Sequence, residues 1–493
     1  VAFTRQPQNV SIPDLSSVTL SAAGTSDATM SIADLNGRPT ANFVMYQWYK
    51  NGAAIPGATR PSLTLSEVPL SDNGAQIVCA IRALGYANDA LQPIWSNSQP
   101  ATLSVVSTPP TFVASAIYTD YNLTNVGGGS LPALCVDLGF SKRMDATVLS
   151  NAVYSLTGGL TVTNVAVSGN GRTVKLFVSG NPTGSVTVSV SGLKDASGLS
   201  LPAISGAAVR PLGLVSADVG WPGADPIFPS KLWVENTNAF TVEAEGSDIW
   251  GTADGFNFLY EQKTGDFDVV VRQKKITHTS QWAKGGLMVR ESLNADSRNW
   301  NIVNTPVAAD GIMAPDNSGY GSSGIECNWR TNTAGESTGW DNIPRDTPAA
   351  YPNAWVRLKR SGQVLTAYYS TNGLSWKLAA TQDVSTTAGG ALPSTVYLGI
   401  ATTAHNNDTF EPYKFWNVSE YADYNSSYVA PLPAATLKVT LVGANASISW
   451  TPAGGRLQSS ASLSGGWTDV TGATNPMTVP TTGQPKFYRV VNP

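Results

Sequence analysis

Charge, cysteine and histidine are all scarce in this 493-residue chain. Charged residues make up 13% of it, about half of the roughly 25% that soluble domains usually carry. The three cysteines, Cys79, Cys135 and Cys327, lie far apart, and only two histidines occur. This scarcity excludes a disulfide framework within a domain and a clustered zinc site. We therefore expect no metal centre of that kind.

The net charge is −4 at pH 7, so no basic field favours phosphate ligands. We therefore expect neither nucleic acid nor an anionic membrane surface as a partner. No run of about 18 consecutive apolar residues occurs, which predicts no membrane insertion. The sequence opens at Val1 almost directly into strand-like sequence, as either a processed secreted protein or a trimmed chain would, and we expect a secreted or cell-surface location.

Turn residues recur at short intervals and separate short alternating apolar runs, whereas stretches with helical periodicity are lacking. This pattern is typical of all-β proteins. At about 150 residues per domain, the length predicts three or four domains. Proline-marked breaks at 107–111 (STPPT) and 429–433 (VAPLP) favour a tandem array of β-sandwiches. Their predicted bounds are 1–106, 107–211, 212–428 and 429–493.

Two segments in the first domain resemble bacterial immunoglobulin-like modules. Residues 46–59 (YQWYKNGAAIPGAT) are similar to the C strand and its turn, and residues 77–80 (IVCA) are similar to the F strand. The resemblance implies a core packed around Trp48. The partner cysteine expected near Ala22 is absent, so this core would lack a disulfide.

The second domain resembles another bacterial immunoglobulin-like module, through residues 140–145 (FSKRMD) and 193–198 (LKDASG). Asp195 lies in the latter motif. A turn-forming role is favoured for its carboxylate, and a calcium contact is the alternative. No other cofactor is expected.

The third domain contains residues 248–260 (DIWGTADGFNFLY), 282–292 (WAKGGLMVRES) and 396–406 (VYLGIATTAHN). In this order they resemble a bacterial family of concanavalin A-like, or laminin G-like, β-sandwiches that serve as non-catalytic accessories in secreted proteins. Within 282–292, Leu287 and Val289 are predicted to face the core, and Gly285 and Gly286 are predicted to allow a close approach of strands. Arg290 and Glu291 are expected to form a surface or cross-strand pair.

The last domain carries residues 448–450 (ISW), 466–470 (GWTDV) and 487–490 (FYRV). These resemble a small C-terminal β-sandwich that closes long secreted bacterial proteins. The resemblance implies either a sorting tag or a docking surface.

Patterns for catalysis are few. A retaining glycoside hydrolase needs two carboxylates about 5 Å apart, and Glu243 with Glu245 is the one candidate pair. Two solvated strand-face acids are the favoured interpretation. A Ser-His-Asp system would require His278 or His405, and a structural hydrogen-bonding role is favoured for His405. We predict no catalytic residue and no enzyme activity.

Aromatic side chains favour a binding role, because sugars stack on exposed rings. Trp300, Trp329 and Trp340 lie in the loop-like region 294–350. With His405 they are candidate glycan contacts, and burial under a long loop is the alternative for the tryptophans.

Residues 1–12 are an extended-looking segment that completes either its own domain or a neighbouring subunit. Val1, Phe3 and Val10 are therefore candidate assembly residues. The chain also has six possible glycosylation sites: Asn9, Asn122, Asn407, Asn417, Asn425 and Asn445.

The favoured function is that of a non-catalytic extracellular structural protein. It would be a cell-surface or fibre subunit that assembles head to tail with copies of itself through its β-sandwich domains. One alternative is a carbohydrate-binding adhesin that recognises cell-surface polysaccharide. A second is an accessory or degenerate polysaccharide hydrolase.

Overall fold

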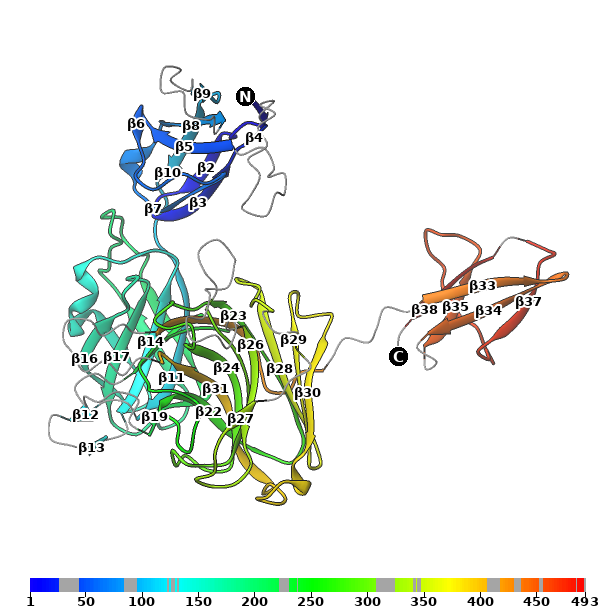
Figure 1. The fold of residues 1–493 in the computed structure, drawn as a ribbon. Helices are drawn as coiled ribbons and strands as arrows, with labels where there is room; N and C mark the ends of the chain where they lie inside the picture. The colour runs from blue at the N-terminus through cyan, green and yellow to red at the C-terminus, as the bar shows by residue number, and fades with distance from the viewer. Residues whose placement is uncertain are drawn as a thin grey trace, which may run out of the picture. The chain divides into compact units, whose positions relative to one another are not determined.

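The computed structural model describes most of the chain. The described residues are 1–25, 44–83, 95–121, 124–125, 129–130, 133–220, 230–236, 238–306, 324–339, 343, 347–405, 417–429, 436–451, 455–484 and 486–491. In these ranges strands form several separate sheets, and the helical elements are short 3₁₀ turns (Figure 1). The predicted fold class, an all-β array of β-sandwiches, is confirmed. Contacts divide the chain into two compact units, Val1–Ser426 and Ser427–Pro493.

The N-terminal strands enclose a core around Trp48. This side chain is fully buried, and its indole N–H donates to the Arg60 carbonyl at 2.8 Å. Trp48 lies opposite Cys79 in the ladder between β5 and β8, and Ala22 belongs to the same buried cluster. The predicted disulfide-free core is confirmed, since Cys79 is a buried free thiol. The elements are β1 (Ala2–Arg5), β2 (Val10–Pro13), β3 (Ser16–Ser21), β4 (Ala23–Thr25), β5 (Val44–Lys50), β6 (Ala53–Ala54), β7 (Ser62–Val68), η1 (Leu70–Asp72), β8 (Ala75–Ala83), β9 (Ser96–Asn97) and β10 (Ala101–Val106).

The next strands form a second aliphatic core, which contains Val136, Leu138, Val174 and Leu176. β14 lies between β11 and β17 and pairs antiparallel with both. The elements are β11 (Phe112–Asp120), β12 (Thr124–Asn125), β13 (Gly129–Ser130), β14 (Ala133–Phe140), η2 (Ala146–Leu149), η3 (Asn151–Val153), β15 (Tyr154–Leu156), β16 (Thr161–Val167), β17 (Thr173–Ser179) and β18 (Val186–Val190).

One long strand joins this group to the large sandwich that follows. β19 (Ile204–Val219) is 16 residues long and pairs with β18 through its first half, with β11 from Arg210 onward and with β22 through its last residues. The result is a continuous sheet of 13 strands. The sequence boundary at 211/212 lies inside β19.

The large sandwich has two facing layers. The first continues from β19 in the order β22, β31, β24, β25, β26, β27, and the second has the order β20, β21, β32, β23, β28, β29, β30. The elements are β20 (Lys231–Asn236), β21 (Ala239–Ala244), β22 (Phe256–Thr264), β23 (Phe267–Lys275), β24 (Lys284–Arg290), β25 (Asn299–Asn304), β26 (Ile325–Arg330), β27 (Thr338–Gly339), β28 (Ala354–Ser361), β29 (Val364–Ser370), β30 (Lys377–Asp383), η4 (Val384–Thr386), β31 (Thr395–Thr403) and β32 (Asn417–Asn425).

β24 is the central strand predicted from WAKGGLMVRES. Leu287 and Val289 are fully buried and face the core between the layers, as predicted. A Cβ atom on Gly285 would overlap the side chains of Gln273 and Tyr421 from the opposite layer. A Cβ atom on Gly286 would overlap the Ile302 carbonyl oxygen in the neighbouring strand β25, so the predicted close approach of strands is confirmed for the Gly285–Gly286 pair.

A buried ammonium group lies where the N-terminal strands meet the second group. Lys142 Nζ donates to Asp14 Oδ1 and to the Thr108 carbonyl, and lies 3.5 Å from Asp195 Oδ2. The other oxygen of Asp195 accepts the N–H groups of Ser197 and Leu199, both at 2.9 Å. Asp195 thus has the favoured turn-forming role, and its calcium contact stays a prediction.

A second buried ammonium group lies between the second group and the large sandwich. Lys175 Nζ is 3.5 Å from Asp137 Oδ1 and donates to the Leu232 carbonyl of β20 at 2.7 Å. The N–H of Val234, also in β20, donates to Asp137 Oδ2 at 2.8 Å. Tyr118 is part of the core cluster of the large sandwich. Strand pairing, apolar packing and buried charge therefore all cross this junction.

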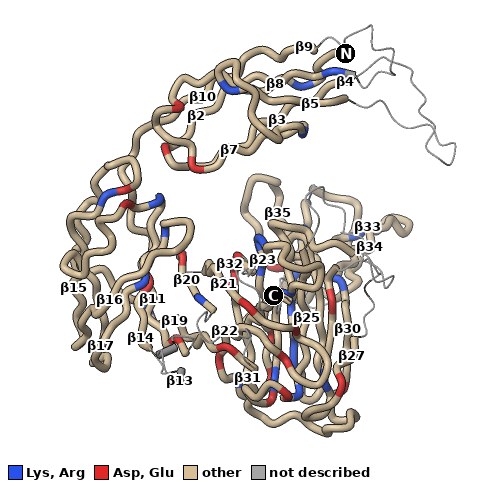
Figure 2. The backbone as a smooth tube through the Cα atoms, turned by 60° about the vertical axis from the view of Figure 1, so that its left-hand side comes forward, with Lys and Arg blue, Asp and Glu red and all other residues tan. Residues whose placement is uncertain are grey.

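The unit Ser427–Pro493 is a small sandwich with two three-stranded sheets, ordered β33, β34, β37 and β36, β35, β38. Trp450 and Ile448 are buried in its core. The strands are β33 (Thr436–Val442), β34 (Asn445–Thr451), β35 (Arg456–Ser460), β36 (Thr468–Asp469), β37 (Met477–Pro480) and β38 (Phe487–Val491). In Figure 2, the stretches coloured as Lys, Arg, Asp or Glu are a small part of the described tube.

The carboxyl group of Asp218 in β19 gives a prediction about pH. Burial raises its pKa to about 6, although hydrogen bonds from Asn257 and the Ser230 N–H oppose this rise. A carboxyl group in an unfolded chain has a pKa near 4, so the folded state binds the proton more tightly. Stability from this group is thus present below about pH 4 and is lost as the pH rises through 6.

We predict that Asp218→Asn reduces the fall in unfolding free energy between pH 4 and 6. Denaturant titrations of the variant and the unaltered chain at several pH values measure this slope. Identical slopes for both proteins would contradict the assignment.

Candidate functional site

Three sequence motifs that are far apart in the chain converge at one end of β24. Lys284, from WAKGGLMVRES, is the first residue of β24 and lies opposite Thr403 in β31. His405 follows that strand directly, and Asp248 comes from the loop before β22, where it forms a bridge with Gly255. Strand pairing over a long sequence separation therefore assembles the cluster.

Hydrogen bonds connect this cluster in a chain. Asp248 Oδ1 accepts from Lys284 Nζ at 2.6 Å, and Asp248 Oδ2 lies 3.2 Å from His405 Nε2. The other ring nitrogen, His405 Nδ1, lies 3.3 Å from Ser280 Oγ. The Lys284 side chain is only 3% exposed, whereas those of Asp248 and His405 are 25% and 31% exposed. A carboxylate and an imidazole thus face solvent above an enclosed ammonium group.

The backbone at His405 is unusual, with φ of +50°. Such a conformation is uncommon outside glycine, although histidine, asparagine and aspartate adopt it more readily than others. The predicted hydrogen-bonding role of His405 is present in the structure, and the residue also contributes an exposed edge.

The Asp248 carboxyl is ionised under ordinary conditions. Burial alone would raise its pKa, but the charge of Lys284 and the hydrogen bond with His405 outweigh that effect and lower it to about 2. An ionised carboxylate only accepts hydrogen bonds. The cluster is therefore suited to polar recognition, with a fixed acceptor beside an imidazole.

A fully buried charge cluster supports the loop that carries Asp248. Asp254 accepts from Arg290 at 3.1 Å, from Asn299 at 3.1 Å, and from Arg330 at 2.6 and 2.9 Å. The Arg330 guanidinium also donates to the carbonyls of Trp250 and Gly251. The two arginine side chains and the Asp254 side chain are 0% exposed. This network determines the path of residues 248–255.

The prediction that Arg290 forms a surface or cross-strand pair with Glu291 is wrong. Arg290 pairs with Asp254 under a covering loop, and Glu291 instead lies 3.6 Å from Arg298. Both faces of β24 are covered, so an alternating pattern does not identify a solvent-facing side here.

The predicted loop position of the candidate tryptophans is also wrong for two of them. Trp300 lies in β25 and Trp329 lies opposite it in β26. Trp300 is only 4% exposed, and its indole N–H donates to Gln382 Oε1 at 2.5 Å. Trp329 is partly exposed and packs against the core. Trp340 lies outside the described residues.

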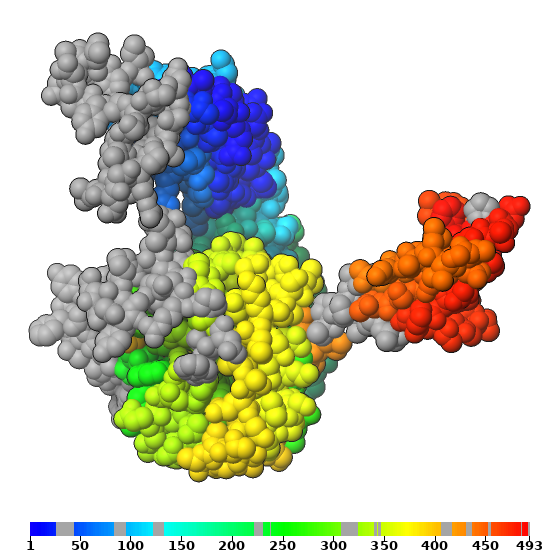
Figure 3. Space-filling view, turned by 45° about the vertical axis from the view of Figure 1, so that its right-hand side comes forward, coloured from blue at the N-terminus to red at the C-terminus, as the bar shows by residue number. Residues whose placement is uncertain are grey.

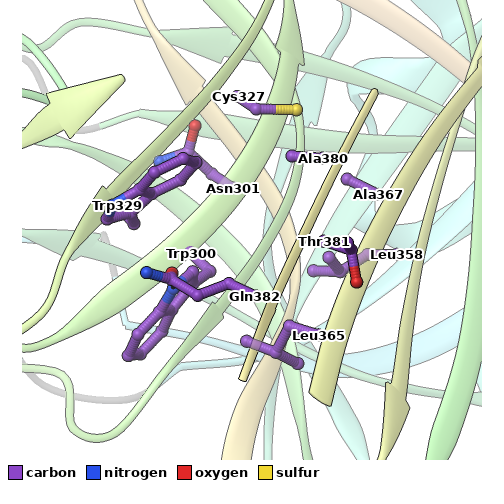
Figure 4. A pocket seen from close by; sticks show the side chains of 10 residues that line it. All are labelled: Trp300, Asn301, Cys327, Trp329, Leu358, Leu365, Ala367, Ala380, Thr381 and Gln382. Carbon is purple, nitrogen blue, oxygen red and sulfur yellow. The ribbon is translucent and has the colours of Figure 1, made fainter. Parts of the chain in front are cut away.

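A small pocket lies beside these two rings, between β25 and β26 of one layer and β28 to β30 of the other. Figure 4 shows Trp300, Trp329 and Gln382 on one side of it and Leu358, Leu365 and Thr381 on the other. Its cavity volume of about 20 Å³ holds roughly one water molecule. A sugar ring does not fit inside a cavity of that size, and the glycan contacts of Trp300 and Trp329 stay a prediction.

Two of the three N-terminal candidates, Phe3 and Val10, lie in sheets of their own chain. β1, with Phe3, pairs with β4, and β2 pairs in parallel with β10, where Val10 lies opposite Leu103. Phe3 and Val10 pack against the Trp48 core, and Val1 is 38% exposed.

Four of the six possible glycosylation sites lie within the described residues. Asn9, Asn425 and Asn445 are exposed. Asn417 is fully buried and donates to the Thr403 carbonyl at 2.8 Å, so its amide is closed to modification in the folded chain. Asn122 and Asn407 lie outside the described residues.

The two candidate catalytic carboxylates, Glu243 and Glu245, lie in surroundings typical of residues that stabilise the fold. Glu243 Oε1 accepts from the Trp233 indole at 2.9 Å, and Glu243 Oε2 is 3.8 Å from Lys231 on the paired strand. Glu245 is buried, with 6% exposure.

Within the described ranges, no group of three or more His, Cys, Asp or Glu side chains could hold a metal ion. No helix in those ranges has the length and apolar character to cross a membrane.

A scan against protein-family models finds no match, and a search of curated proteins finds none either. Among solved structures, a functionally unknown protein from Saccharomyces cerevisiae is 16% identical, with 42% of this chain and 95% of that chain covered and a TM-score of 0.30. Lectin I from Ulex europaeus, solved with the methyl glycoside of α-L-fucose, is 8% identical, with 43% and 97% covered and a TM-score of 0.24.

The N-terminal part of the bacterial S-layer protein SbsC is 15% identical, with 41% of this chain and 42% of that chain covered and a TM-score of 0.18. At such identities and scores, these likenesses carry no argument about function.

The Asp254 cluster gives a prediction about stability. Asp254→Asn leaves two buried guanidinium groups without their counter-charge, which should cost about 3 to 5 kcal/mol of unfolding free energy. Asp423→Asn is the matched control, because Asp423 pairs with Arg272 at 2.8 Å in a partly exposed position. That change should cost at most about 1 kcal/mol. Denaturant unfolding of both variants measures the difference, and equal losses would refute the special role of Asp254.

Proposed function

We propose that this chain is a non-catalytic structural protein of the cell surface or of an extracellular fibre, assembled with copies of itself through its β-sandwich domains. The observation that carries the proposal is β19, which unites two groups of strands in one sheet. Domains joined only by a linker move relative to each other by default, whereas a shared strand transmits force through backbone hydrogen bonds. Such coupling suits a load-bearing subunit.

The motif resemblances support the same role. They suggest immunoglobulin-like modules over 1–106 and 107–211, a concanavalin A-like sandwich over 212–428 and a small sandwich over 429–493. Arrays of this composition are expected outside the cell, with other copies as partners. The structural surroundings of Glu243 favour a role without catalysis.

Assembly of the purified full chain tests this proposal. Light scattering at increasing protein concentration should show mass growth beyond the monomer, and electron microscopy should show ordered, repeating contacts. A mass that stays at the monomer value up to the highest concentration would count against a fibre or surface-layer subunit.

Carbohydrate binding is a second candidate, favoured by the cluster of Asp248 and His405. These side chains are held in place by Lys284 and Ser280 and are partly exposed. Each oxygen of the Asp248 carboxylate can accept a second hydrogen bond, from a sugar hydroxyl group, and the partly exposed ring of His405 offers a surface beside it for the sugar to pack against.

A glycan array of the unaltered chain and of two variants tests the second candidate. His405→Asn retains a side chain that tolerates positive φ and removes the imidazole, so saturable binding should be lost. His278→Asn, a change of the other histidine, should leave binding intact. Equal binding by both variants would remove His405 from the proposed site.

A further inference from the structure

The small C-terminal sandwich has an apolar edge strand that is open to solvent. In the described part of this unit, β33 (TLKVTLV) pairs with β34 alone. Val439, Leu441 and Val442 are 54%, 74% and 61% exposed. In Figure 3 the orange part of the chain, which includes β33, presents an open surface on the face shown. An exposed edge of this length and apolarity is a template for another strand.

Two of the three exposed side chains, Val439 and Leu441, belong to the row that faces the core, and Val442 belongs to the opposite row. Directly paired residues share one face of a sheet, and Leu437, Val439 and Leu441 lie opposite Trp450, Ile448 and Ala446, respectively. The three partners are buried, and Leu437 packs against them. The core-facing row is therefore covered at Leu437 and uncovered at Val439 and Leu441.

The free backbone groups of β33 belong to the same apolar residues. Val442 and Asn445 are paired across a two-residue loop whose first residue, Gly443, has φ of +62°. In such a hairpin the pair next to the loop is hydrogen-bonded, and hydrogen-bonded pairs then alternate. Thr436, Lys438, Thr440 and Val442 therefore direct their N–H and C=O groups toward β34. Leu437, Val439 and Leu441 direct theirs to the open edge.

We propose that β33 is a self-pairing interface, at which two copies of this chain join their edges antiparallel about a two-fold axis at Val439. In this register Val439 lies opposite Val439 of the second copy, and Leu437 lies opposite Leu441. Each of these three residues, whose backbone N–H and C=O groups point to the open edge, then lies opposite a residue whose backbone groups also point to its open edge. The uncovered apolar row becomes continuous across a six-stranded sheet. This inference rests on the proposed function and names one surface through which copies meet. A two-fold contact joins two copies into a closed pair, so growth of a fibre from such pairs uses a second surface.

Several registers of the two β33 strands would keep the apolar row on one face of the joined sheet. Lys438, the one charged residue of β33, favours one of these registers over the others. Lys438 lies opposite Thr440 when the axis passes through Val439. A shift of the axis to Lys438 would place two ammonium groups opposite each other, which is destabilising. A shift to Thr440 would leave Leu437 without a partner. The strand lacks acidic residues, so a strongly basic partner gains nothing from it.

Sedimentation of the full chain tests the interface. The double variant Val439→Thr, Leu441→Thr keeps β-branched or strand-compatible side chains and removes apolar contact from both copies. It should weaken self-association at least about tenfold. Leu463→Thr is the matched control, since Leu463 is 71% exposed and lies outside β33. It should leave self-association unchanged.

Single cysteines test the register. Val439→Cys should yield a disulfide-linked dimer on mild oxidation, because hydrogen-bonded antiparallel partners have Cα atoms about 5.5 Å apart, within disulfide range. Leu437→Cys and Leu441→Cys should each fail to cross-link alone and should cross-link when mixed. The native cysteines in the described structure are buried and should not interfere.

The outcomes separate this inference from the broader proposal. If the chain assembles but the double variant and the control behave alike, the β33 interface is wrong while assembly stands. If the chain is monomeric at every concentration and Val439→Cys does not cross-link, both are wrong. A cross-link at Val439, with association lost only in the double variant, supports both.

Discussion

The hydrogen-bonded ladder of β19 is the constraint on which the first unit depends. Its 16 residues pair with β18, β11 and β22, so two groups of strands belong to one sheet. Each backbone hydrogen bond contributes only about 1 kcal/mol net, but breaking the ladder would also leave buried polar groups unpaired and open a shared core. Tyr118 and Cys135 pack in the same cluster as Leu232 and Val234 of the large sandwich. The two groups therefore form one mechanical body.

Few charges are present, and several of them are buried where parts of the chain meet. Lys142 lies between Asp14 and Asp195 at one junction, and Lys175 lies beside Asp137 at the next. Buried ion pairs add little net stability, but an arrangement with unmatched partners is strongly disfavoured. We infer that these groups specify geometry more than they increase stability. The Asp254 cluster does the same for the loop that carries Asp248.

The sequence predicted those features that depend on local pattern. Alternation identified Leu287 and Val289 as core residues, and the Trp48 motif identified the first core. Pro211 and Gly213 resemble a linker, yet β19 continues through them because the ladder with β11 shifts register there and Gly213 adopts φ of +77°. Such a bulge tolerates residues that end most central strands. Of the candidate site, His405 was predicted as a contact, whereas Asp248 and Lys284 were missed because they meet it only through pairing between β24 and β31. The motifs containing Asp248, Lys284 and His405 were the one available signal.

Pulling on a single molecule tests the mechanical claim most directly. If β19 makes one body of the strands from β11 to β32, stretching the full chain should release about 320 residues in one step, or roughly 110 nm of contour length. Separate steps, one of about 105 residues for the second group and a larger one for the sandwich, would show that β19 does not couple them. That result would remove the basis for a load-bearing role.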